Sequence, residues 1–154
     1  MKKVLIAYFS PGGTTEKMAQ YIAEGVRFSG HEAVTRDIKD IKSPADLAGY
    51  DGYIFGSPTY SLALPGAMKL FLDTLEEAGL EGKPGGAFGP YRHDAGYSHD
   101  SHAPAVIFNI IQETGKMVPF ELGAFVLQEE TVGTGRGMEA CQDYGRVFGE
   151  RLDS

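Results

Sequence analysis

The feature of this sequence that could do the most chemistry is a short loop rich in glycine and hydroxyl groups. The loop is Ser10-Pro11-Gly12-Gly13-Thr14-Thr15, and it lies between an apolar run and a segment with helical periodicity. Two glycines allow a tight turn that points backbone N–H groups at one spot, where the helix dipole adds partial positive charge. Three hydroxyls supply further donors. The loop therefore predicts a phosphate site without lysine or arginine, although a glycine turn with Thr14 as N-cap is a simpler alternative.

Other phosphate-related motifs are absent from this position. The sequence contains neither a GxGxxG dinucleotide fingerprint nor a GxxxxGK[ST] loop. A phosphatase of similar architecture would need its cysteine in this loop, but the only cysteine is Cys141. A phospho-accepting receiver would need acidic residues directly after the first strand, and none is present there. Uncharged donors suit a monoester phosphate that is carried on a larger molecule.

A second group of chemically active residues lies between positions 93 and 102. It includes three of the four histidines, His93, His99 and His102, together with Asp94 and Asp100. Imidazoles and carboxylates at this density can bind zinc, iron or nickel, so a metal or tetrapyrrole site is one alternative. A segment rich in Gly, Ser and Asp is also typical of an ordinary solvated connection. We assign no metal ligand.

The hydrophobic pattern predicts strands that alternate with helices along the chain. Short apolar runs bounded by glycine, proline or serine are typical of strands that are buried on both faces. We expect strands at 3–9, 33–38, 52–55, 84–88 and 120–127. Helices are expected where apolar residues recur at intervals of three and four, at 14–29, at 65–75, at 105–114 and after Gly137.

This alternation favours an α/β fold with a parallel sheet covered on both faces. A closed barrel needs roughly 250 residues, so we predict an open, doubly wound, five-stranded sheet in a single domain over residues 1–154. Such sheets bind ligands beyond the carboxyl ends of their strands. That rule selects three loops, called here the first (10–15), the second (56–62) and the third (89–102).

Three motifs in or beside these loops carry a family resemblance. They are Gly13-Thr14-Thr15-Glu16-Lys17-Met18, Gly56-Ser57-Pro58-Thr59-Tyr60 and Ala87-Phe88-Gly89-Pro90-Tyr91, in this order. The ordered trio resembles the FMN-binding loops of flavodoxins, and most of all the flavodoxin modules fused to di-iron oxygen reductases. The resemblance covers the whole chain and implies a flavodoxin-like sheet with strand order 2-1-3-4-5. It also implies FMN as cofactor.

The resemblance further implies which residues contact FMN. They are Ser10, Gly12, Gly13, Thr14 and Thr15 around the phosphate, and Ser57, Pro58, Thr59, Tyr60, Ser61, Phe88, Gly89, Pro90, Tyr91 and His93 around the ring. Tyr60 and Tyr91 would offer aromatic faces to a flat, mostly apolar ring. After Tyr91 the third loop departs from the fused modules, because it continues with Arg92 and His93. No residue is assigned a catalytic role.

The implied function is an FMN electron carrier that docks redox partner proteins. The net charge of −7 disfavours nucleic acid and anionic membranes as partners. The short apolar run at the N-terminus and the absence of any stretch of about 20 apolar residues predict a cytoplasmic protein. The alternatives are an FMN-dependent oxidoreductase of a small, quinone-type acceptor and a flavin-free metal or tetrapyrrole module. We expect His31 at the surface and Cys141 in the core.

Overall fold

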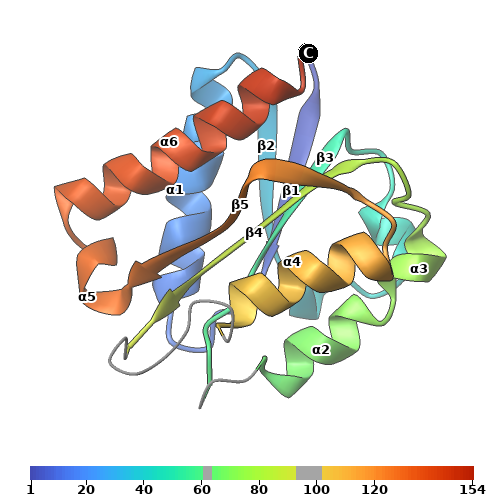
Figure 1. Ribbon diagram of the computed structural model, residues 1–154, viewed down its shortest axis with the longest axis horizontal. Helices are drawn as coiled ribbons and strands as arrows, with labels where there is room; N and C mark the ends of the chain where they lie inside the picture. Colours follow the sequence, from blue (N-terminus) through green and yellow to red (C-terminus); the bar gives the residue numbers. More distant parts are fainter. Residues whose placement is uncertain (61–63, 93–101) are drawn as a thin grey trace.

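The computed structural model describes residues 1–60, 64–92 and 102–154. Within these ranges five parallel strands form one sheet in the order β2-β1-β3-β4-β5, as predicted (Figure 1). The strands are β1 (Lys3–Tyr8), β2 (Glu32–Asp37), β3 (Gly52–Gly56), β4 (Pro84–Tyr91) and β5 (Val118–Gln128). The chain passes from β1 to β2 on one side and returns to β3 on the other. The loops after β1 and β3 therefore diverge, which is where such sheets bind ligands.

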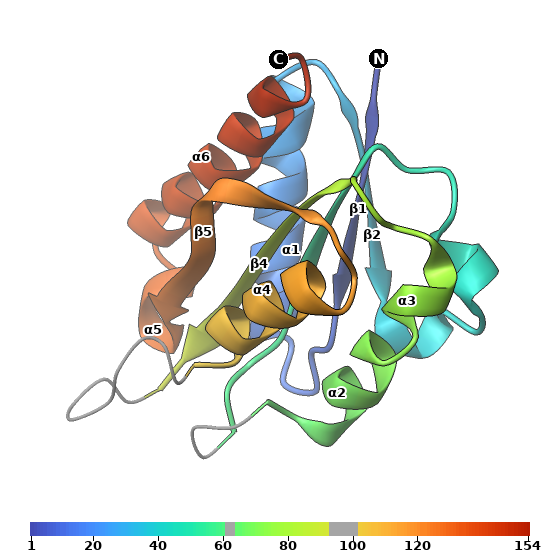
Figure 2. The same cartoon turned by 45° about the vertical axis from the view of Figure 1, so that its right-hand side comes forward.

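Helices cover both faces of the sheet (Figures 1 and 2). One face carries α1 (Thr14–Phe28) and α6 (Gly135–Arg151), and the other carries α2 (Gly66–Leu72), α3 (Leu75–Ala78) and α4 (Ala103–Glu113). Two 3-10 helices, η1 (Ile38–Asp40) and η2 (Pro44–Leu47), follow β2, and α5 (Glu129–Val132) follows β5. Each of the helices in the described ranges is too short or too polar to span a bilayer.

The core lies in two layers on either side of the sheet. Along β1, Val4 and Ile6 contribute to the layer under α1 and α6, whereas Leu5 and Ala7 contribute to the layer under α2, α3 and α4. Successive side chains of a strand point to opposite faces, and here both faces are covered. This double burial explains the near-continuous apolar run at the start of the sequence. Cys141 is buried in the first layer, as predicted, and burial raises the pKa of its thiol to about 12.

Several boundaries differ from those expected. β4 was expected to end at residue 88 but continues to Tyr91, because Gly89 and Pro90 pair with Val126 and Leu127 of β5. The last partner of β4 in β3 is Gly56, opposite Phe88, so beyond that point Pro90 lies on a free edge where its missing N–H costs little. The helix expected at 65–75 is divided into α2 and α3, and the four-residue α5 was not expected.

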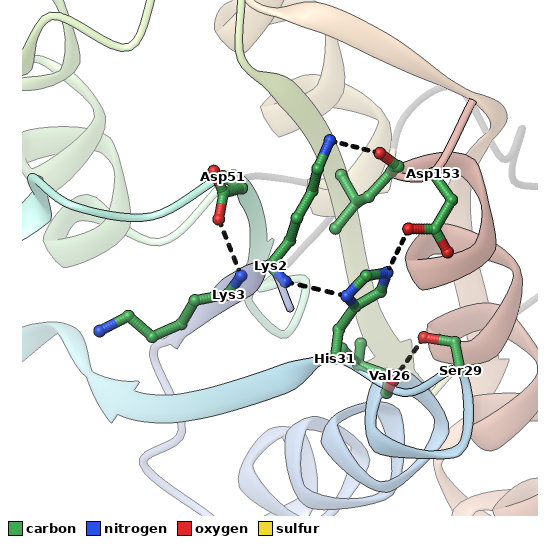
Figure 3. Close-up of polar contacts among 8 residues, drawn as sticks. Lys2, Lys3, Val26, Ser29, His31, Asp51 and Asp153 are labelled. Atoms are coloured by element: carbon green, nitrogen blue, oxygen red, sulfur yellow. Dashed lines mark hydrogen bonds and ion pairs between the residues drawn. The ribbon is translucent and has the colours of Figure 1, made fainter.

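His31 was expected at the surface, and that prediction was wrong. Its side chain is buried, with 8% of the residue exposed. Nδ1 accepts a hydrogen bond from the backbone N–H of Lys2 at 3.0 Å, and Nε2 lies 3.0 Å from a carboxylate oxygen of Asp153 (Figure 3). These contacts join the start of β1, the start of β2 and the end of α6 at the amino ends of the strands. Asp153 lies 122 positions from His31, so nothing in the sequence near Gly30 indicates this contact.

Candidate functional site

A cavity of about 620 Å³ opens at the carboxyl ends of β1, β3 and β4. Nine of the predicted contact residues line it: Ser10, Gly12, Thr14, Thr15, Pro58, Thr59, Tyr60, Pro90 and Tyr91. Four residues that were not among the predicted FMN contacts also line it: Pro11, Arg92 and His102, which lie in the predicted loops, and Glu129, which lies outside them. Small-molecule sites commonly measure about 300–1,000 Å³, so the three loops enclose a space of ligand size.

The first loop places the N-terminus of α1 against this cavity. Gly13 precedes the helix with φ +91°, a left-handed conformation that favours glycine. The hydroxyl oxygen of Ser10 accepts the N–H of Glu16 at 2.9 Å, which fixes the loop against the first turn. The N–H groups of Thr14 and Thr15 belong to that turn, where no helical acceptor is available. The cavity wall therefore presents unused amide donors beside two threonine hydroxyls.

Glu129 joins the first loop to the third. It is the first residue of α5, and its carboxylate accepts a hydrogen bond from the Thr14 hydroxyl at 3.4 Å. Its other oxygen lies 2.7 Å from Nε of Arg92. Among the described residues that line the cavity, one acidic and one basic side chain thus pair with each other. Sequence reasoning missed Glu129 because α5 was not expected, although it follows a strand whose carboxyl end lies at the same edge of the sheet.

The start of the second loop is packed against β4. Ser57 is fully buried, its N–H donates to the carbonyl of Phe88 at 3.1 Å, and its hydroxyl donates to the carbonyl of Pro58 at 2.9 Å. A Cβ on Gly89 would overlap the backbone oxygen of Ser57. Ser57, Phe88 and Gly89 therefore lie behind the cavity wall, and they hold the second and third loops close together. Like Gly13, they are absent from the cavity lining.

The next residues of the second loop, Thr59 and Tyr60, contact α4 and the residue that follows β1. The hydroxyl oxygen of Thr59 accepts the N–H of Ala103, the first residue of α4, at 2.8 Å. Tyr60 is 47% exposed, and its ring meets the ring of Phe9 edge-on, with centroids 6.3 Å apart. One tyrosine of the cavity thus lies half in solvent at its rim.

The third loop contributes a stacked pair of rings. Tyr91 and His102 lie with ring centroids 4.6 Å apart and planes inclined by 25°, and both line the cavity. His102 is the N-cap of α4 and only 1% exposed. The sequence placed it in the third loop but suggested a metal ligand rather than an FMN contact, because its stacking on Tyr91 is a tertiary contact. α4 also begins two residues earlier than expected. Pro104, a residue type favoured in the first turn, is the signal that could have located this helix start.

Comparison with known proteins assigns a family to this geometry. Residues 3–132 match the family model described as NADPH-dependent FMN reductase. A flavodoxin from Clostridium saccharobutylicum is 34% identical over 153 residues, which cover 97% of this chain and 94% of that protein. The chain belongs to the flavodoxin-like FMN proteins. FMN is its cofactor.

Solved structures agree with the fold of this flavodoxin-like protein. An archaeal flavodoxin matches with a TM-score of 0.82 and 25% identity, over 99% of both chains. The flavodiiron protein of Giardia intestinalis matches with a TM-score of 0.80 and 23% identity, over 99% of this chain and 36% of that one. The second match shows a shared fold with one part of a larger protein, in line with the resemblance to the fused modules.

The residues of this flavodoxin-like protein fit FMN. A phosphate monoester needs donors, and the wall formed by the first loop supplies first-turn amides and hydroxyls. A Cβ at Gly12 would meet no other atom within 4 Å, so a ligand can approach the backbone there. The isoalloxazine ring needs apolar or aromatic surfaces, which Tyr60, Tyr91 and the neighbouring prolines supply.

Part of the predicted site falls outside the described residues. Ser61 and His93 are among these, as is most of the histidine-rich stretch that suggested a metal or tetrapyrrole alternative. Within the ranges that the structure describes, no group of three or more His, Cys, Asp or Glu side chains is placed to hold a metal ion.

Proposed function

We propose that this protein is an electron carrier that holds FMN in the 620 Å³ cavity between its three loops. One observation carries the proposal. A single cavity combines uncharged phosphate donors at the N-terminus of α1 with the aromatic side chains of Tyr60 and Tyr91. FMN has these two parts, a terminal phosphate and a flat ring. When bound, FMN supplies chemistry in one- and two-electron steps.

In this proposal the first loop binds the phosphate. The amides of Thr14 and Thr15 and their hydroxyls donate to its oxygens, and Gly12 lets the phosphate approach the backbone. The Ser10 hydroxyl keeps its proton free to donate, because its oxygen already accepts the N–H of Glu16. Thr14 would then turn its hydroxyl from Glu129 toward the phosphate.

The second and third loops bind the ring. Pro58, Thr59 and Tyr60 line one wall, and Pro90 and Tyr91 line another. Tyr91 stacks on the buried ring of His102, which restricts the positions that its own ring can take. Tyr60 is half-exposed, which leaves a rim of the cavity within reach of a partner protein. The net charge of −7 favours a basic redox partner over nucleic acid. A cytoplasmic location stays a prediction.

The second candidate is an FMN-dependent reductase of a small, quinone-type acceptor. The observation that favours it is the family match, because the description of that family names an NADPH-dependent activity. A reductase would need to accept hydride from NADPH without help from a second protein. A carrier would not.

The two candidates are separated by an anaerobic experiment with the FMN-loaded protein. We expect NADPH alone to leave the flavin oxidised over minutes. Protein reduced chemically should pass electrons rapidly to ferricytochrome c, a basic protein, at a rate that falls as salt screens the charges. Rapid bleaching by NADPH, with sustained quinone reduction, would instead support the reductase.

A further inference from the structure

A second cavity, of about 630 Å³, adjoins the FMN cavity and is not used by the proposed function. Ser10 and Pro11 of the first loop line both cavities. The second one lies between the segment that follows β2 and helix α2. It is as large as the first, and its volume falls within the range of small-molecule sites.

The walls of this cavity are mostly apolar. Phe9, Ile38 and Ile41 contribute from the sheet side, and Leu70 and Phe71 contribute from α2. Leu70 is 71% exposed, although it stands beside buried Phe71 on the same helix. Phe9 also contacts Tyr60 edge-on, and Tyr60 lines the FMN cavity. An occupant that packs against Phe9 would therefore be separated from the FMN cavity by these two rings.

One carboxylate and two ammonium groups line the cavity, and a second carboxylate, that of Asp46, accepts the backbone N–H of Lys42 beside it. The groups that line the cavity are those of Asp37, Lys39 and Lys42. Asp37 is already engaged, because its carboxylate accepts the N–H of Lys39 at 3.0 Å and lies 3.9 Å from the Lys39 ammonium. The Lys42 ammonium donates to the carbonyl of Lys39 at 2.7 Å, which leaves two of its three N–H donors for a ligand. The rest of the protein is acidic, with a net charge of −7.

We propose that this second cavity binds a small aromatic anion. The ring of the ligand packs against Phe9, Leu70 and Phe71, and its carboxylate, sulfonate or phosphate group lies at the Lys42 ammonium. The remaining N–H donors of the Lys42 ammonium favour an anion over a cation, because the Asp37 carboxylate is already paired with Lys39. The apolar walls decide between an aromatic anion and a simple inorganic one. The inference goes beyond electron transfer by FMN, since it adds a second ligand beside the cofactor.

The test uses 1-naphthalenesulfonate as the probe and the FMN-loaded protein as the target. FMN content is measured first by absorbance, and probe binding is then measured by calorimetry while flavin fluorescence reports any release of FMN. We expect one probe per chain, bound without release of FMN. Lys42→Gln should weaken binding about threefold to fivefold, as expected for an exposed ion pair, and Leu70→Ser should weaken it similarly. Lys69→Gln is the matched control, because Lys69 is exposed on α2 and lines neither cavity.

Three results would overturn this proposal. They are the absence of saturable binding, equal affinity in the Lys42 and Leu70 variants and the wild-type protein, and binding that displaces FMN. Sedimentation of the protein without probe tests one more alternative. A dimer that Leu70→Ser abolishes would show that a second copy of the chain occupies the cavity, and would also overturn the proposal. A protein that takes up no FMN would contradict the proposed function instead. The same titration and variants would then still test the second cavity.

Discussion

The ring of Tyr91 is stacked on the imidazole of His102, 4.6 Å away, and both side chains line the cavity in which we place FMN. His102 is only 1% exposed, and it is the N-cap of α4. The start of α4 therefore packs against the aromatic residue that we assign to the flavin.

We predict that His102→Ala weakens FMN binding. The substitution removes a buried ring that stacks on Tyr91 and leaves a cavity beside it, so Tyr91 is no longer held in one position for the flavin. An aromatic pair contributes about 0.5–1.5 kcal/mol beyond its buried area, so the FMN dissociation constant should rise about twofold to tenfold. His102→Phe retains an aromatic ring and should bind FMN nearly as well as the wild-type protein.

Titration of the flavin-free protein with FMN, followed by fluorescence quenching, measures this change. His31→Ala is the matched control, because His31 is also buried but lies at the amino ends of the strands, away from the cavity. An unchanged FMN dissociation constant for His102→Ala would show that the stacked pair does not position the flavin.

Thr14→Val should weaken FMN binding while leaving riboflavin binding unchanged. The substitution keeps the shape of the side chain but removes the hydroxyl that we assign to the phosphate. A hydrogen bond to a charged group contributes about 1.5–3 kcal/mol, so the FMN dissociation constant should rise at least about tenfold. Thr14→Ser retains the hydroxyl and should bind nearly as well as wild type. A dissociation constant that is unaltered by Thr14→Val would place the phosphate elsewhere.

Gly89→Ala should destabilise the protein and weaken FMN binding together. A Cβ at this position would overlap the backbone oxygen of Ser57, so the second and third loops would have to separate. Overpacking of this kind costs about 1–3 kcal/mol. Gly135→Ala is the control, because a Cβ there would meet no other atom within 4 Å. Chemical denaturation and flavin titration measure both effects, and a stable Gly89→Ala protein with normal affinity would contradict this packing.

Cys141 should resist alkylation in the folded protein. The thiolate is the reactive form, and burial raises the pKa of this thiol to about 12. At pH 8 the thiol is therefore protonated as well as shielded, and iodoacetamide should modify it only after denaturation. Mass spectrometry of native and unfolded samples measures this. Rapid labelling of the native protein would show that α6 opens readily.

The parts of the fold that local patterns determine were predictable from the sequence. The double burial of β1 and the spacing of Met18, Ile22 and Val26 in α1 leave direct signals in the apolar pattern. The end of β4 was misjudged because Pro90 normally ends a strand, and only the early end of β3 allows β4 to continue. Where such a strand ends therefore depends on its neighbouring strands, which are distant in the sequence.

The same distinction between local patterns and contacts of distant residues applies to the site. The first loop was identified because glycines and hydroxyls at a helix start have a local physical meaning. Glu129 and His102 were missed because their roles come from tertiary contacts, with Thr14 and Arg92 in one case and with Tyr91 in the other. His31 was misplaced for the same reason, since Asp153 comes to it from the other end of the chain.

The central claim is that the first loop holds the phosphate of FMN. Equilibrium titration of the flavin-free protein with FMN and with riboflavin, followed by fluorescence quenching, tests it most directly. We predict one FMN per chain, with riboflavin bound at least about a hundredfold more weakly, because it lacks two or more charge-assisted hydrogen bonds. Riboflavin bound as tightly as FMN would contradict the claim.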